Sequence, residues 1–197
     1  VMKNALPNSV TPESTLGAIR TSDVLVATVT SDELKGGAVR FDTVDGKAAL
    51  WSFSEALKRG CQVGLDLQPQ ELIVGLHAKK IKDIASASIF ISDALENGAG
   101  YAVELGSKDN FKRILESIEN DLTTEWTRDE HALRCGSSCP DCLRSYDNRR
   151  IHGFLNWRLA LDIVDLSIGK SLELSRWFSN AEFKLENFIK MFPDLKA

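Results

Sequence analysis

The residues best suited to chemistry lie close together in the segment 131–142, which holds His131, Cys135, Cys139 and Cys142. Thiolate and imidazole groups are the donors that Zn²⁺ prefers, and structural zinc sites are usually closed by four of them. The Cys-x-x-Cys spacing of Cys139 and Cys142 allows a tight turn to direct two sulfur atoms at one ion, while Gly136 keeps the approach of Cys135 flexible. The pattern therefore predicts a zinc site in preference to a disulfide or a redox pair.

Two histidines are candidates for the fourth ligand. We call the segment 131–142 the knot. His131 lies just before Cys135 and is close enough to bind the same ion as the three cysteines, which makes it the preferred candidate. His152 follows Cys142 near the start of a predicted helix and is the alternative. The remaining cysteine, Cys61, lies in an apolar run far from the knot and is predicted to be a small core residue.

Signatures of catalysis are missing from the sequence. Neither the deaminase pattern with His-x-Glu nor the hydrolytic His-Glu-x-x-His occurs. The glycines of Gly98-Ala-Gly100 do not form a nucleotide-binding loop, and small residues are expected there because the chain turns sharply. The isolated chain is therefore predicted not to be an enzyme. A zinc enzyme with an open metal position and a thiol redox switch remain as alternatives.

Composition and charge are those of an ordinary globular chain. Hydrophobic residues make up 43% and charged residues 26% of the 197 residues, and the net charge is −4. No apolar run reaches the length of a membrane span, and the N-terminus does not look like a signal peptide, so a cytoplasmic protein without membrane contact is predicted. Such a charge does not attract nucleic acid by itself, but four arginines around the knot could form a local basic face: Arg144, Arg149, Arg150 and Arg158. Pairing of these arginines with the acidic segment 116–130 is the alternative.

Periodicity predicts a mixed α and β fold. The expected architecture is a sheet of about four or five strands with helices packed on it, followed by the zinc knot and a helical C-terminal portion. Strands are predicted at 23–30, 61–67, 71–77 and 88–93, and helices at 47–59, 101–105, 110–119, 155–168 and within 171–195. Gly60 and Gly169 are expected to end two of these helices.

The segment 142–162, together with Asp93 and Gly98-Ala-Gly100-Tyr101, resembles the MrfA-like zinc-binding domain. That family lies at the C-terminal end of many DEAD/DEAH-box (superfamily 2) helicases and also occurs in some bacterial phage-defence proteins. The resemblance extends from about residue 88 to 166 and more faintly back to 21. The better-known family version has four cysteines, and its first cysteine would fall on Leu133, for which His131 is the natural substitute.

The resemblance implies a cytoplasmic, zinc-bound accessory module of a DNA helicase that acts in DNA repair or phage defence. Its partners would be the helicase motor domains, in the same or a partner chain, and DNA. Residues 21–168 would form the zinc-binding domain, preceded by a loose arm at 1–20 and followed by a helical extension at 169–197. Because the sequence starts with Val1 and not with methionine, it is expected to be part of a longer protein.

Overall fold

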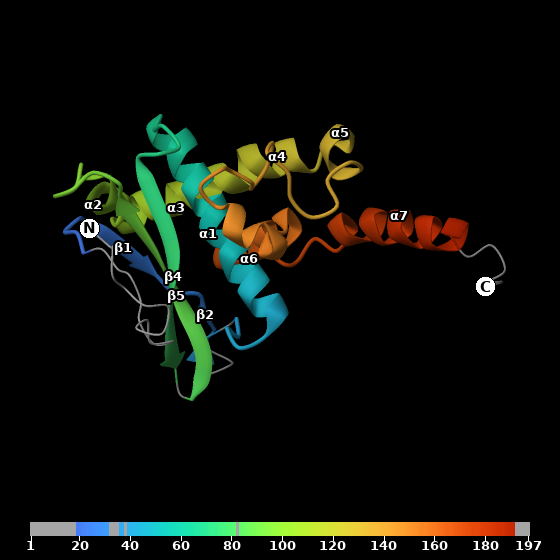
Figure 1. The fold of residues 1–197 in the computed structure, drawn as a ribbon, viewed down its shortest axis with the longest axis horizontal. Helices are drawn as coiled ribbons and strands as arrows, with labels where there is room; N and C mark the ends of the chain where they lie inside the picture. The colour runs from blue at the N-terminus through green and yellow to red at the C-terminus, as the bar shows by residue number, and fades with distance from the viewer. Residues whose placement is uncertain (1–18, 32–35, 38, 82, 192–197) are drawn as a thin grey trace, which may run out of the picture.

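A small antiparallel sheet packs against one long helix, and shorter helices surround that helix (Figure 1). The structure is a computed structural model that describes residues 19–31, 36–37, 39–81 and 83–191. The strands are β1 (Val24–Ala27), β2 (Thr30–Ser31), β3 (Gly36–Gly37), β4 (Leu72–Ile81) and β5 (Ile84–Asp93). The α-helices are α1 (Val44–Leu65), α2 (Tyr101–Leu105), α3 (Lys108–Ser117), α4 (Thr123–Trp126), α5 (Asp129–Ala132), α6 (Trp157–Ser167) and α7 (Ser175–Met191).

The main sheet has three strands in the order β1-β5-β4, and β2 pairs only with β3. The mixed α and β class is confirmed, but the prediction of four or five strands in the sheet is wrong. The central strand β5 places Ile91 opposite Leu25 of β1 and Val74 of β4. Ile89 and Ile91 are buried under α1, because alternate residues of a strand point to the same face.

The segment 61–67 was predicted to be a strand and instead continues helix α1 as far as Leu65. Gly60 does not end this helix. It lies within the helix, at a point where α1 packs closely against Ile118. A Cβ at Gly60 would lie 2.4 Å from Cγ1 of Ile118, so a neighbouring helical turn occupies the space that any side chain would need. The helix ends at Asp66, whose left-handed conformation has a φ of 53°.

Helix α1 forms the centre of the core. Thr43 caps its N-terminus by accepting a hydrogen bond from the Gly46 amide at 3.1 Å. Its buried side chains meet β5 on one side and α6 on another, and the core continues into the π-helical turn Ile118–Leu122. Trp126 and Trp157 are the largest fully buried side chains, so both tryptophans belong to the core.

The two ends of the described chain differ in their attachment. Residues 1–18 of the predicted arm lie outside the described residues, while Arg20 donates a hydrogen bond to the carbonyl of Ala94 at 3.0 Å. Helix α6 ends close to Gly169, whose φ is 79°, as predicted. Helix α7 then projects away from the body (Figure 1). The domain boundaries at 21 and 169 stay predictions. Among the described residues, no helix is both long enough and apolar enough to cross a membrane.

Candidate metal centre

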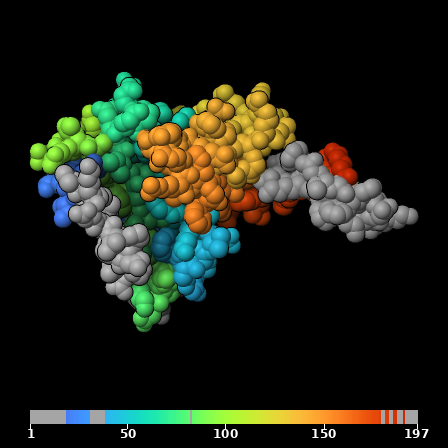
Figure 2. All heavy atoms as spheres, viewed as in Figure 1, coloured from blue at the N-terminus to red at the C-terminus, as the bar shows by residue number. Residues whose placement is uncertain are grey.

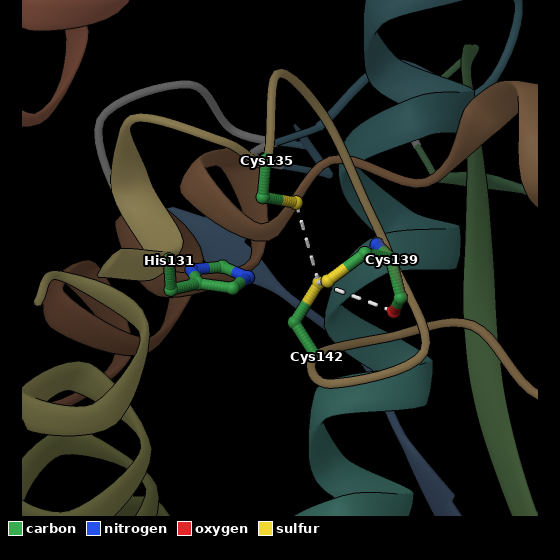
Figure 3. Close-up of side chains that lie close together, drawn as sticks. All are labelled: His131, Cys135, Cys139 and Cys142. Carbon is green, nitrogen blue, oxygen red and sulfur yellow. Dashed lines mark hydrogen bonds between the residues drawn. The ribbon is translucent and has the colours of Figure 1, made fainter. Parts of the chain in front are cut away.

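The four predicted zinc donors lie close together, with Cys135 and Cys142 buried and His131 and Cys139 partly buried (Figure 3). One ligand atom from each of His131, Cys135, Cys139 and Cys142 lies within 4.8 Å of all the others. The Cys142 sulfur is 3.8 Å from the sulfurs of both Cys135 and Cys139. A tetrahedral site with Zn–S bonds of about 2.3 Å has S–S edges of about 3.8 Å, whereas a disulfide needs about 2.05 Å. The spacing therefore fits a zinc shell and does not fit a disulfide.

Short backbone turns bring the three thiols together. The Cys135 amide donates to the His131 carbonyl at 2.8 Å, which continues α5 by one turn and places both residues on the same side. In the second turn the amides of Cys142 and Arg144 both donate to the Cys139 carbonyl, at 3.2 and 2.9 Å. The Cys139 amide also donates to the Cys142 sulfur at 3.1 Å. The knot is thus held by local backbone hydrogen bonds.

The imidazole of His131 is oriented for metal binding. Its Nδ1 lies 2.7 Å from the Trp126 carbonyl oxygen, which can only accept, so Nδ1 carries the proton and donates. Its Nε2 is therefore left with a free lone pair, and this atom is buried without a hydrogen-bond partner. A buried polar atom without a partner is costly unless something binds it. Metal-ligating histidines usually donate their other N–H to a carbonyl in this way.

His152 lies outside this cluster. Its Nε2 is 2.9 Å from Oδ1 of Asn148 and 3.0 Å from the Ser145 carbonyl. Asn148 in turn donates to the Leu143 carbonyl at 2.8 Å. His152 therefore helps to hold the loop that follows the knot, and His131 is the histidine that the fold brings to the three thiols.

The three thiols do not ionise alike. Hydrogen bonding from the Cys135 thiol, helped by backbone amides, lowers the pKa of Cys142 to about 5. The same hydrogen bond, with burial, raises the pKa of Cys135, and burial raises the pKa of Cys139. Cys142 is thus the thiol that ionises first. Zinc ligation requires thiolates, so binding of the ion would release the remaining thiol protons.

The sequence comparisons agree with this geometry. Residues 53–143 match the family model of the MrfA Zn-binding domain. This segment is therefore similar to an MrfA Zn-binding domain. The match is to a zinc-binding domain, not to a catalytic one, and with the four donors at zinc spacing it makes Zn²⁺ the cofactor of this chain.

A curated relative of the chain is Druantia protein DruE of Escherichia coli (strain UMEA 4076-1), with 27% identity over 120 residues. The alignment covers 59% of this chain and only 6% of that protein, so the chain corresponds to a small part of its relative. No solved structure matches the chain.

The glycine turn at residues 98–100 encloses a carboxylate of its own chain. Asp93, at the end of β5, is fully buried and accepts hydrogen bonds from four successive amides, those of residues 99–102, at 2.6 to 3.2 Å. Gly98 and Gly100 adopt φ values of 81° and 89°, which other residues rarely reach. The turn therefore ties α2 to the sheet, as its small residues suggested.

The four arginines predicted to form a basic face do not lie together on the surface. Arg149 and Arg150 are exposed, and Arg149 stacks on the exposed Tyr146 with 4.3 Å between Cζ and the ring centre. Arg144 is half-buried and donates to the Ser138 hydroxyl at 2.9 Å.

Unlike the other three arginines, Arg158 is fully buried, with an exposed fraction of 0%. The prediction that it belongs to a surface face is therefore wrong. Arg158 instead donates to backbone carbonyls of the knot. Its place directly after Trp157, within the apolar stripe of the predicted helix 155–168, was the one sign in the sequence of a buried cation.

Proposed function

We propose that this chain is an accessory module that holds one structural Zn²⁺ through His131, Cys135, Cys139 and Cys142. The observation that carries the proposal is the gathering of four donors within 4.8 Å of one another, with two S–S distances of 3.8 Å and with Nε2 of His131 otherwise without a partner. Zinc bound there would supply cross-links among four side chains and no reactive group. The chain's own residues would then keep the segment 131–155 folded against α1 and α6.

The direct test replaces zinc with Co²⁺ in the purified protein and records its absorption spectrum. A closed shell of three thiolates and one imidazole predicts strong thiolate-to-cobalt bands and intense tetrahedral d–d bands. It also predicts that added cyanide or a small thiol leaves the spectrum unchanged, because no coordination position is open. A spectrum that shifts on addition of such a ligand would contradict a structural site.

The same experiment separates the two alternatives. A hollow beside His131 and Cys139 is lined by Glu125 and Glu130, and a zinc enzyme would need a base in such a place. Four protein donors leave no position for a substrate, however, so a zinc enzyme requires that one donor stay unbound. A redox switch requires a disulfide, and none joins these sulfurs at 3.8 Å.

We further propose that the module serves a longer DNA helicase or phage-defence helicase and docks on its motor domains. The support is the resemblance of the segment 142–162 to that family, the match of residues 53–143 to the MrfA Zn-binding domain, and a relative of which the alignment covers 6%. The test is made on the full-length protein, by measuring DNA-stimulated ATP hydrolysis and unwinding with and without the Cys139→Ser change. Loss of unwinding with ATP hydrolysis kept would support an accessory role. Full unwinding without the knot would refute it.

Contact with DNA is the finer part of the proposal. The segment that follows the knot forms part of the outer surface and is orange in Figure 2. In this segment Arg149 and Arg150 are exposed near the exposed Tyr146, and Arg144 is half-buried. Phosphate contacts by such residues are tolerant of sequence and sensitive to salt, with about one unit of salt slope for each contact. The net charge of −4 opposes binding, so we expect weak affinity for the isolated module.

A titration of single- and double-stranded DNA at low salt tests this face. Arg149→Glu/Arg150→Glu should bind more weakly and with a smaller salt slope than wild type. The matched control is Lys80→Glu/Arg113→Glu, which changes the charge equally at two exposed positions on other elements and should bind like wild type. Equal binding by all three proteins would remove DNA contact from the role of this face.

A further inference from the structure

A buried guanidinium connects the metal centre to the base of helix α7. Arg158 donates through Nη1 to the carbonyls of Cys135 and Gly136, at 3.4 and 3.2 Å. Its Nη2 donates to the carbonyl of Ala132 at 3.3 Å. Its Nε donates to the carbonyl of Arg176 at 2.6 Å. One side chain therefore holds three carbonyls of the knot and one carbonyl of α7.

Helix α6, which carries Arg158, holds α7 at two further points. Asp162 accepts from the Arg176 guanidinium at 3.1 Å and from the indole N–H of Trp177 at 2.9 Å. Asp165 accepts from the Arg176 guanidinium at 2.6 Å. Arg176 is only 9% exposed, so these ion pairs are shielded from water and depend strongly on their geometry.

Beyond this base, the side chains of α7 that the structure describes include large apolar ones that face solvent. Phe178 and Leu185 are 62% and 59% exposed, and the helix projects from the body in Figure 1. The direction of α7 therefore depends on the contacts that Arg158, Asp162 and Asp165 make with its first turn.

The charge of Arg158 also requires a partner. Its hydrogen bonds all run to neutral carbonyls, and its guanidinium stacks on the ring of Trp157 at 4.2 Å. A shell of three thiolates and one neutral imidazole around Zn²⁺ carries one negative charge. The loaded knot would therefore supply the anion that a buried cation needs. Trp157 supports the same arrangement, because its indole N–H donates to the Cys135 carbonyl at 3.2 Å.

We propose that Arg158 is a positioning residue that couples zinc binding to the docking of α7. The proposal rests on the structural zinc site argued above. With zinc bound, the carbonyls of residues 132, 135 and 136 hold the Arg158 guanidinium in a fixed orientation. In that orientation its Nε donates to the Arg176 carbonyl of α7. When zinc is lost, the turn 132–136 relaxes, the guanidinium loses its supports, and the first turn of α7 detaches.

The coupling must work in both directions, because linkage between two binding events is reciprocal. Loss of Arg158 should weaken zinc binding by about 10- to 100-fold, as is typical when a partner that orients metal ligands is removed. Arg158→Lys should not restore it, since an ammonium is a point charge and cannot replace a planar fork that reaches four carbonyls.

The experiment measures zinc affinity by competition with a chelator, and hydrogen exchange of the amides of residues 174–178, in the whole chain. Wild type should lose protection at 174–178 when zinc is removed, while the β5 amides stay protected. Arg158→Met and Arg158→Lys should show this loss with zinc present and should bind zinc more weakly. Arg113→Met, which removes an exposed arginine of α3, is the matched control and should behave as wild type.

A variant on the α7 side keeps the test decisive if the Arg158 variants do not fold. Arg176→Met removes the ion pairs to Asp162 and Asp165 without touching the knot, and it should expose 174–178 and weaken zinc binding by a smaller factor. Unchanged protection at 174–178 after zinc removal from wild type would overturn the coupling. A wild-type protein that binds no zinc would instead refute the structural zinc site itself.

Discussion

The sheet with α1 forms one region, and the knot with the loop that follows it, residues 131–148, forms another. The two regions are stabilised in different ways. In the sheet and α1 the interior is apolar, and Leu57, Ile89 and Ile91 are at most 1% exposed. In the knot the buried side chains are mainly thiols and hydrogen-bonded polar groups, such as Cys135, Cys142 and Asn148. The first region is stabilised by removing apolar surface from water, whereas the second contains four donors that a bound metal ion would cross-link.

Because of this difference, we expect loss of zinc to destabilise the knot and not the sheet. Cys135 and Cys142 belong to the same hydrophobic core as the sheet and α1. The start of α6 also links the two regions: Asn156 donates through its amide to the Ser52 hydroxyl of α1 at 2.8 Å, and Trp157 and Arg158 bond to the knot. Loss of zinc should therefore loosen 131–155 and whatever depends on it, while the sheet persists.

The largest effect is expected from Cys139→Ser, which should abolish stoichiometric zinc binding. Structural zinc supplies on the order of 10 kcal/mol of apparent binding free energy in small zinc peptides, and removing one thiolate forfeits much of that. Metal analysis and hydrogen exchange should show no bound zinc and lost protection at 131–155, with β5 unaffected. Cys61→Ser is the control, because Cys61 is buried in the core away from the knot and should keep zinc. Stoichiometric zinc in purified Cys139→Ser would contradict the assignment.

The next effect compares the two histidines. His131→Ala should lower zinc affinity by at least about 100-fold, since it removes a ligand and not only an orienting partner, whose loss costs about 10- to 100-fold. His152→Ala should leave zinc affinity near that of wild type and loosen only the loop 143–148, which it holds through Asn148. Competition with a chelator measures both. The reverse result would make His152 the ligand.

A substitution in the apolar core should lower the stability of the protein and leave zinc binding intact. Ile91→Ala removes a fully buried side chain between the sheet and α1 and should lower the free energy of unfolding by about 2–5 kcal/mol. Urea unfolding measures the loss, and the folded variant should still bind one zinc. Val26→Ala, at a 61% exposed position of β1, is the control and should change stability little. A loss of zinc from folded Ile91→Ala would show that the two regions are not separable.

A smaller effect is expected where α1 meets the π-helical turn. Gly60→Ala should destabilise by about 1–3 kcal/mol, because a Cβ there would meet Cγ1 of the buried Ile118 at 2.4 Å. Gly64→Ala is matched to it on the same helix and would meet only the end of the Ile114 side chain, which can move aside. There the better helix propensity of alanine should prevail and raise stability slightly. Thermal unfolding of the pair tests this, and equal shifts would refute the packing explanation.

The smallest effect concerns Glu55 of α1, whose pKa is raised from its ordinary value of 4.5, mainly by burial. The folded protein therefore holds this proton more tightly than the unfolded chain. Stability should fall as the pH rises from about 4.5 through the raised pKa, since the buried carboxylate must then ionise. Glu55→Gln should remove this part of the pH dependence and be more stable than wild type at neutral pH. Glu96→Gln, at an exposed position, should leave the pH profile of urea unfolding unchanged.

Much of the fold could be predicted because local periodicity controls it. The strands at 71–77 and 88–93 and the helices at 110–119 and 155–168 appear as β4, β5, α3 and α6, with shifted ends. The segment 61–67 could not be predicted, because its apolar residues suit a strand as well as a buried helix. Gly60 packs against Ile118, which is distant in sequence, and local periodicity does not reveal such a contact.

The sequence by itself determined the donor set of the metal centre, because the four donors are so close along the chain that local turns suffice to gather them. Only the tertiary structure decided what surrounds them. The Trp126 carbonyl orients His131, and the position of α6 places Arg158 beneath the knot and away from solvent. The physical reason is that burial and hydrogen-bond partners depend on contacts between distant segments, and residue type and spacing alone do not encode them.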